Sequence, residues 1–159
     1  MRLLAAAFVC AWLAIAQMPK RPRITGLAHV ALHVQDIDKA RWFYKDFLGF
    51  GEPFLLNNPD GSLALTFIKI NDRQYIELFP GAKPDSDRLH HISIETDDAE
   101  AMRAYLGARG IAVPDKVGKG RIRNSNFNVK DPDGHTVEIV QYEPDGWSMR
   151  EKGRHMSEA

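Results

Sequence analysis

The chain repeats itself once, and this repeat limits the possible folds more than any other feature of the sequence. Residues 27–34 and 89–96 are both apolar runs of the kind that form strands. Each leads into a helical pattern that ends at a glycine, Gly49 in the first half and Gly110 in the second, 61 residues later. Glycine readily adopts the left-handed conformation that ends a helix. The sequence therefore predicts two similar units of about 60 residues.

Each unit is expected to contain a strand, a helix and three further strands, the order βαβββ. One such unit would leave a face of its sheet exposed, so the two should pack together and form a cleft between them. After the opening strands, the helices are expected over 40–48 and 101–108, and the later strands over 51–56, 62–70, 74–79, 112–116, 125–130 and 135–142. Three aromatic residues of the first helix are expected to pack on the sheet: Trp42, Phe43 and Phe47.

Residues 1–16 have the order of a secretory signal peptide. Arg2 gives a short positive start, and an almost unbroken apolar run ends in the small-x-small sequence Ala14–Ala16. The run is too short for an ordinary transmembrane helix, which needs roughly 20 apolar residues. We therefore expect an exported protein, periplasmic or secreted, with residues 17–24 as a linker. An uncleaved N-terminal anchor is the alternative.

Removal of the signal peptide leaves 143 residues, which suits one domain, and also removes Cys10, the single cysteine. The mature chain then has no disulfide and no thiolate ligand. It carries 20 basic and 21 acidic residues without a basic stripe, which argues against a nucleic-acid partner. No second membrane segment is present in the sequence. The polar tail, 144–159, has Trp147 as its one large anchor and is expected to cover the cleft, contact a second subunit or lack structure beyond that anchor.

Four polar residues lie inside apolar strand patterns. His29 and His91 are in the first strand of each unit, and Glu77 and Glu138 are in the last, at matching offsets of 62 and 61 residues. Taken singly, a strand glutamate is more often solvated, and a strand histidine is more often a core residue. An unpaired buried carboxylate is costly, however, whereas two imidazoles and two carboxylates satisfy and neutralise a divalent cation. The matched pattern therefore predicts a metal site at these four residues.

Other polar residues near these strands are candidates for further roles. In the pair His90-His91, His91 matches His29 in the repeat, and His90 is expected to face the other side of the strand. His33 shares a face with His29 and is either a group in the cleft or a partly exposed surface residue. Eight further residues are weaker candidates for substrate contacts: Arg121, Arg123, Asn124, Asn126, Asn128, Phe67, Tyr75 and Tyr142. The alternative is that these residues are solvated or belong to the core.

These features resemble the vicinal oxygen chelate superfamily, the group of glyoxalases, bleomycin-resistance proteins and extradiol dioxygenases. The resemblance covers residues 25–143 and includes the duplicated βαβββ unit. Residues 129–139, VKDPDGHTVEI, resemble the family's DPDG hairpin and the ligand strand after it. Residues 40–50, ARWFYKDFLGF, resemble its first helix with the FY…LGF ending.

The resemblance implies an α+β fold in which two βαβββ modules, residues 25–80 and 88–143, form a curved, incomplete barrel around a divalent transition metal (Ni, Co, Zn, Mn or Fe). The metal would keep positions open for water or for neighbouring oxygens of a small-molecule substrate, and as a Lewis acid it would stabilise an oxyanion or enediolate. In the glyoxalase I branch the ligand set is His/Glu/His/Glu, and one ligand glutamate leaves the metal to act as the base. Here that base would be Glu138 or Glu77.

The full ligand set favours a glyoxalase-like lyase or isomerase. A non-haem Fe(II) extradiol-type dioxygenase, which needs two histidines and one carboxylate, and a non-catalytic antibiotic-binding protein are the alternatives. Bacterial glyoxalase I has an arginine and an asparagine where this chain has His33 and Gly81, so glutathione is not the expected substrate. Two arrangements of the modules are expected as alternatives: they pair within one chain, or they pair across a homodimer.

Overall fold

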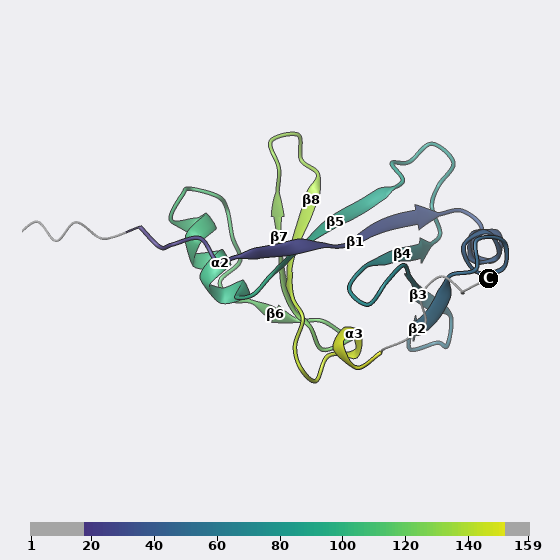
Figure 1. Cartoon of the computed structure of the whole chain (residues 1–159). Coiled ribbons are helices and arrows are strands. Elements are labelled where there is room, and N and C mark those ends of the chain that lie inside the picture. Colours follow the sequence, from purple (N-terminus) through teal and green to yellow (C-terminus); the bar gives the residue numbers. More distant parts are fainter. Residues whose placement is uncertain (1–17, 152–159) are drawn as a thin grey trace, which may run out of the picture.

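The computed structural model describes residues 18–151, which form one eight-stranded sheet curled into a half-barrel (Figure 1). The strand order is β2-β3-β4-β1-β5-β8-β7-β6, so the two halves of the chain occupy the two halves of the sheet. This confirms the α+β fold with two repeated modules. The strands are β1 Ile24–Val34, β2 Gly51–Asn57, β3 Leu63–Lys69, β4 Tyr75–Pro80, β5 Leu89–Thr96, β6 Gly118–Lys119, β7 Ser125–Lys130 and β8 Thr136–Gln141.

The two modules join edge to edge through their first strands. β1 pairs antiparallel with β5, with Val30 opposite Ile92 and Ala31 opposite His91. Within each module the first strand also pairs in parallel with the last, β1 with β4 and β5 with β8. The sequence left open whether the modules pair within one chain. In this structure they do, and the four central strands of the sheet come from both modules.

The helices begin and end where the sequence signals lie. Asp36 accepts a hydrogen bond from Lys39 N (3.0 Å) at the start of the first helical segment, and Asp98 accepts one from Ala101 N (2.9 Å) at the start of the second. Gly49 and Gly110, with φ of 79° and 83°, follow these segments in the left-handed conformation. The helices are α1 Ile37–Arg41 with its π-helical continuation η1 Trp42–Phe47, α2 Ala99–Gly107 and α3 Trp147–Arg150.

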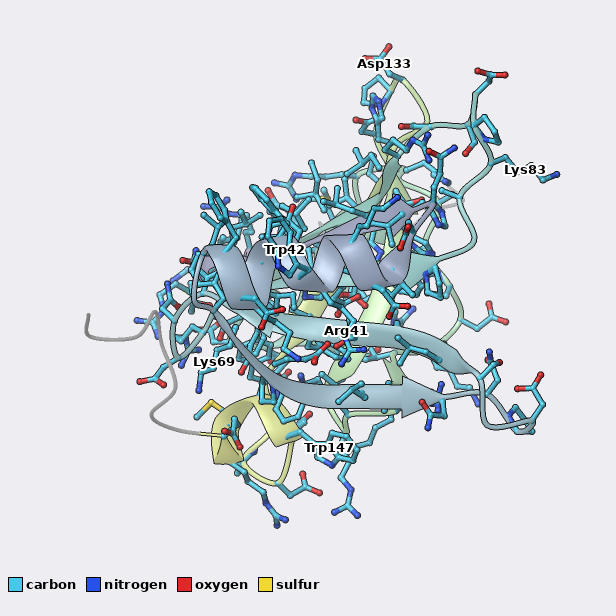
Figure 2. All side chains as sticks on the ribbon, turned by 90° about the vertical axis from the view of Figure 1, so that its right-hand side faces the viewer. Arg41, Trp42, Lys69, Lys83, Asp133 and Trp147 are labelled. Atoms are coloured by element: carbon cyan, nitrogen blue, oxygen red, sulfur yellow. The ribbon has the colours of Figure 1, made fainter. Side chains whose placement is uncertain are left out.

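The side of the first helix that faces the sheet is charged, not aromatic. Arg41 and Lys45 both bind the carboxylate of Glu52 on β2, at 2.6 Å each. Figure 2 shows Arg41 on the side of the helix nearest the strands and Trp42 on the other side. Because the buried Glu52 carboxylate requires cations, the helix turns its basic side inward. The prediction of sheet packing was therefore wrong for the three aromatic side chains, which are 57%, 42% and 65% exposed: Trp42, Phe43 and Phe47.

The strand expected over residues 112–116 is absent from the described part of the chain, so this prediction was wrong. A two-residue strand, β6, forms at Gly118–Lys119 instead. Pro114 has no N–H to give to a strand ladder, and its carbonyl accepts a hydrogen bond from Arg103 (3.1 Å). Val113 packs against the core of the second module. This apolar side chain is thus partly buried without a strand.

Each module has its own small core. In the second module, α2 contributes two buried residues, Ala99 and Met102, to a cluster with Phe127 and Ile139. In the first, the cluster lies inside the half-barrel and consists of Phe54, Leu56, Phe67 and Tyr75. Trp147 of α3 packs against this cluster, with its ring 5.5 Å from that of Phe54. The described part of the tail, up to residue 151, therefore covers the open side of the half-barrel.

Two of the sequence predictions concern residues that the structure does not describe. The signal peptide predicted over 1–16 and the end of the tail, 152–159, lie outside the described residues. Within 18–151, none of the helices has the length and apolar character needed to cross a bilayer.

Candidate metal centre

The four residues predicted to bind metal lie on the four central strands of the sheet: His29 on β1, Glu77 on β4, His91 on β5 and Glu138 on β8. Strand pairing explains why they share a face. Glu77 and His91 are both paired with Ala31, one on each side of β1, so their side chains point the same way.

A second row of paired residues contains the other two side chains. His29 and Glu138 are both paired with Ser93, one on each side of β5. The middle residue of each row is small, and both middle residues are fully buried: Ala31 and Ser93. The large polar side chains therefore meet above small residues inside the half-barrel.

The side chains converge on one point. His29 Nε2 is 2.8 Å from His91 Nε2, 3.4 Å from Glu77 Oε1 and 3.1 Å from Glu138 Oε2. His91 Nε2 is 3.8 Å from a carboxylate oxygen of each glutamate. All four residues are buried. The donor atoms of His29, Glu77 and His91 lie within 4.8 Å of one another and could hold a metal ion.

The two carboxylates are held in different ways. Glu138 Oε2 accepts a hydrogen bond from Ser93 Oγ (2.7 Å), and Glu138 Oε1 accepts one from Asn126 Nδ2 (2.7 Å). Glu77 has only the histidines as polar partners among the interactions described. Glu138 is thus fixed in orientation, whereas Glu77 is not.

Burial and the neighbouring charged and polar groups shift the pKa values of these four residues. Burial raises the pKa of Glu77 to about 7; the nearby His29 opposes this change and Glu138 adds to it. Burial lowers the pKa of His91 to about 4. Burial also disfavours the charged form of His29, but the two carboxylates outweigh it and raise its pKa. For Glu138, burial is outweighed by hydrogen bonds from its neighbours, which lower its pKa.

His90 lies beside His91, although strict alternation along the strand predicts the opposite face. The two Nδ1 atoms are 2.7 Å apart. The register between β1 and β5 shifts here, because Ala31 pairs with His91 and the next residue, Leu32, pairs with Leu89. His90 is the extra residue of a β-bulge, and a bulge changes the direction of a side chain. The predicted position of His90 was therefore wrong.

The four residues line a cavity of about 260 Å³ whose other walls are largely apolar. Arg121 lies at its wall and donates to Asn57 O (2.6 Å), whereas Arg123 is outside it, 3.9 Å from the Asp145 carboxylate. His33 is also outside it, with its ring 4.8 Å from that of His90. The other weaker candidates from the sequence all line the cavity: Asn124, Asn126, Asn128, Phe67, Tyr75 and Tyr142.

Sequence reasoning missed the role of Ser93 as a hydrogen-bond donor to Glu138. The available signal was its position two residues after His91, which places both on one face of the strand. From the sequence, Asn126 was a candidate only because it is one of three asparagines spaced two residues apart. Its hydrogen bond to Glu138 was not predicted.

The donor set fits a divalent transition metal. Imidazole nitrogens and carboxylate oxygens bind such ions at about 2.0–2.2 Å, so neighbouring donors on one ion stand about 3 Å apart. The separations of 2.8, 3.1 and 3.4 Å around His29 Nε2 are of this size. The two buried carboxylates would balance the charge of a divalent ion. Such an ion would therefore offset the cost of burying two negative charges in one largely apolar cavity.

Comparison with known proteins gives one family. The model of the Glyoxalase/Bleomycin resistance protein/Dioxygenase superfamily matches residues 26–139. A 3-methylcatechol 2,3-dioxygenase of Pseudomonas putida is 32% identical over 141 residues, covering 83% of this chain and 45% of that protein. A probable lactoylglutathione lyase of Vibrio parahaemolyticus is 32% identical over 124 residues, covering 72% of this chain and 89% of that protein.

The chain spans less than half the length of some of these relatives, 45% of the dioxygenase and 46% of a lactoylglutathione lyase of Schizosaccharomyces pombe. Among solved structures, a methylmalonyl-CoA epimerase from Mycobacterium tuberculosis superposes with a TM-score of 0.64 at 21% identity, covering 76% of this chain and 90% of that one. This likeness shows the fold alone.

Proposed function

Because this chain belongs to the Glyoxalase/Bleomycin resistance protein/Dioxygenase superfamily, we propose that it is a divalent-metal-dependent enzyme of the glyoxalase-like lyase or isomerase type. Its substrate is a small molecule with two neighbouring oxygens. Relatives in this superfamily include a lactoylglutathione lyase, a methylmalonyl-CoA epimerase and catechol dioxygenases. The names of the lyase and the epimerase describe reactions that do not consume molecular oxygen.

His29, Glu77, His91 and Glu138 would hold the metal ion. When bound, a divalent cation acts as a Lewis acid that stabilises negative charge developing on substrate oxygens. The protein contributes the rest of the site. The cavity is lined by apolar side chains such as Leu65 and Phe67, which exclude water from the reacting groups.

The main support for this proposal is that the two carboxylates differ in their hydrogen bonds. Glu138 is fixed by Ser93 and Asn126 through both of its oxygens, which suits a permanent ligand. Within residues 18–151, Glu77 has no such hydrogen bonds, so it can turn away and take a proton from a substrate carbon. The geometry thus favours Glu77 as the base, a choice that the sequence left open between Glu77 and Glu138.

The test is proton transfer by the metal-loaded protein in D₂O. The substrates are the hemithioacetal of methylglyoxal with glutathione and with a small neutral thiol, and methylmalonyl-CoA. We expect product formation or deuterium incorporation with Ni²⁺, Co²⁺ or Zn²⁺, without oxygen uptake. Glu77→Gln should lower the rate about 10²- to 10⁴-fold, the usual contribution of a general base.

A matched control and a metal measurement accompany this test. Glu100→Gln changes an exposed glutamate on α2 and should leave the rate unchanged. Elemental analysis of wild type and of His91→Ala should show bound metal in the first and its loss in the second. A wild-type protein that binds no divalent metal at micromolar concentration contradicts the proposal.

A dioxygenase is the second candidate, because one observation favours it. His29, Glu77 and His91 form a set of two histidines and one carboxylate, which is typical of non-haem Fe(II) oxygenases. A relative that covers 83% of this chain is a 3-methylcatechol 2,3-dioxygenase. Oxygen uptake by the Fe(II)-loaded protein with 3-methylcatechol, and no activity with Ni²⁺ or Zn²⁺, would favour this candidate over the first.

We also propose that the protein is exported and that residues 1–16 are removed. The apolar run and the small-x-small sequence before Gln17 support this. Expression of the full chain in a bacterial host, followed by mass spectrometry of the periplasmic and cytoplasmic fractions, tests it. A chain that stays in the cytoplasm and begins at Met1 contradicts it.

A further inference from the structure

The bulge at the start of β5 places a second imidazole against a candidate metal ligand. The rings of His90 and His91 are 4.9 Å apart at an angle of 73°, and their Nδ1 atoms are 2.7 Å apart. This distance is that of a hydrogen bond. His90 therefore contacts the nitrogen of His91 that points away from the cluster of donors.

The two nitrogens of His91 have separate partners. Nε2 faces His29 Nε2 and the two carboxylates, as a metal ligand must. A nitrogen that binds a metal carries no proton, so the proton of a neutral His91 is on Nδ1. That Nδ1–H is the donor in the hydrogen bond, and His90 Nδ1 is the acceptor. The proton of His90 is then on its own Nε2.

His90 is held in this position by aromatic contacts. Its ring stacks on Phe79 with centroids 4.3 Å apart and planes 14° from parallel, and the ring centroid of His33 lies 4.8 Å from that of His90. Its side chain is half-buried.

We propose that His90 is a positioning residue that fixes the orientation and the proton position of His91 and thereby strengthens metal binding. This proposal rests on the proposed metal-dependent function. Metal-ligating histidines usually donate their other N–H to a carboxylate, a backbone carbonyl or water. A neutral imidazole in that place orients the ligand without adding a third negative charge to a cavity that already holds two carboxylates.

The proposal is tested by metal affinity, with no substrate needed. Apo-protein is titrated with Zn²⁺ in competition with a chromophoric chelator. His90→Phe keeps the aromatic stack on Phe79 but removes the acceptor, and we expect affinity to fall about 10- to 100-fold. His90→Asn retains an acceptor oxygen near the position of Nδ1, and it should restore most of the affinity. His33→Phe contacts the same cluster without touching His91 and should bind Zn²⁺ as wild type does.

Two spectroscopic measurements separate positioning from a merely structural role. The visible spectrum of the Co²⁺-loaded protein should change in His90→Phe and stay near wild type in His90→Asn. Long-range ¹H–¹⁵N spectra of the Zn²⁺-loaded wild type should show the proton of His91 on Nδ1 and that of His90 on Nε2. The second measurement needs no variant, so it decides the matter even if His90→Phe does not fold.

The outcomes distinguish this proposal from the one on which it rests. A wild type that binds no Zn²⁺ overturns the proposed function. A wild type that binds Zn²⁺ while His90→Phe binds it equally well overturns the role of His90 alone. A proton on His90 Nδ1 or on His91 Nε2 in the loaded protein also overturns it.

Discussion

Glu77 and Glu138 are the same kind of side chain at matching positions of the two modules, yet their surroundings differ. Glu138 accepts hydrogen bonds from Ser93 and Asn126, and Glu77 accepts none from the corresponding strands. A repeat can therefore duplicate a ligand and still assign the two copies different roles. Under the proposed function, fixing one carboxylate and freeing the other would give one site both a stable ligand and a base.

At the residue scale we predict that Ser93→Ala weakens metal binding. The change removes the hydroxyl that holds Glu138 Oε2 at 2.7 Å, so the carboxylate loses part of its orientation. Affinity for Zn²⁺ should fall about tenfold, the lower end of the effect of such supporting partners. Chelator competition measures it, and Ser62→Ala, in an exposed turn, is the control. Equal affinity for Ser93→Ala and wild type would contradict the prediction.

The four donors were predictable from the sequence because their offsets repeat, and the structure brings them together. The position of His90 was not predictable, because alternation along a strand holds only while the register is regular. Nothing in the local sequence indicates the bulge, which depends on how β5 pairs with β1.

At the scale of elements, caps and turns were the reliable signals. Asp36, Asp98, Gly49 and Gly110 act locally, and all four mark helix ends in the structure. The inward face of the first helix was not predictable from its apolar residues. It depends on Glu52, a residue from another element, whose buried carboxylate binds Arg41 and Lys45.

This ion cluster predicts acid sensitivity. Burial alone would raise the pKa of Glu52, but hydrogen bonds from Arg41, Lys45 and Thr66 outweigh it and lower the pKa from 4.5 to about 2. A carboxyl whose pKa is lower in the folded state stabilises the fold above about pH 4.5, and this contribution is lost as the pH falls towards 2. Glu52→Gln should thus lower the free energy of unfolding by about 2 kcal/mol at pH 7 and by much less at pH 3.

Urea denaturation of wild type and Glu52→Gln at both pH values measures this difference. Asp85→Asn, on the exposed link between the modules, is the control and should show no such gap. A gap between wild type and Glu52→Gln that is as large at pH 3 as at pH 7 would show that the ion cluster is not its cause.

At the scale of the molecule, pairing of β1 with β5 puts both halves of the candidate site in one chain. The sequence could not distinguish this from exchange across a homodimer, because either arrangement uses the same four residues. The sequences of β1 and β5 do not indicate whether the two strands pair within one chain or between two chains, because both arrangements pair the same backbone N–H and C=O groups.

We therefore predict one divalent ion per chain, whatever the oligomeric state. The metal content of protein fractions separated by size, measured by elemental analysis, tests this. Monomer and any dimer should both contain one ion per chain. A monomer without metal beside a dimer with metal would indicate instead that the donors come from two chains. A homodimer itself stays a prediction, which sedimentation at several concentrations measures.

The central pairing of β1 with β5 also affects how the protein folds. Ile24 pairs with Thr96, 72 positions later, and Glu138 lies on a strand that pairs with β5. Contacts between such distant segments form slowly, because a long loop must close before they contribute. Neither half contains more than one histidine and one glutamate of the set, so neither can provide the complete site during synthesis. Tight metal uptake would therefore mark the moment at which the whole sheet has formed, and would hold the newly folded chain in that state.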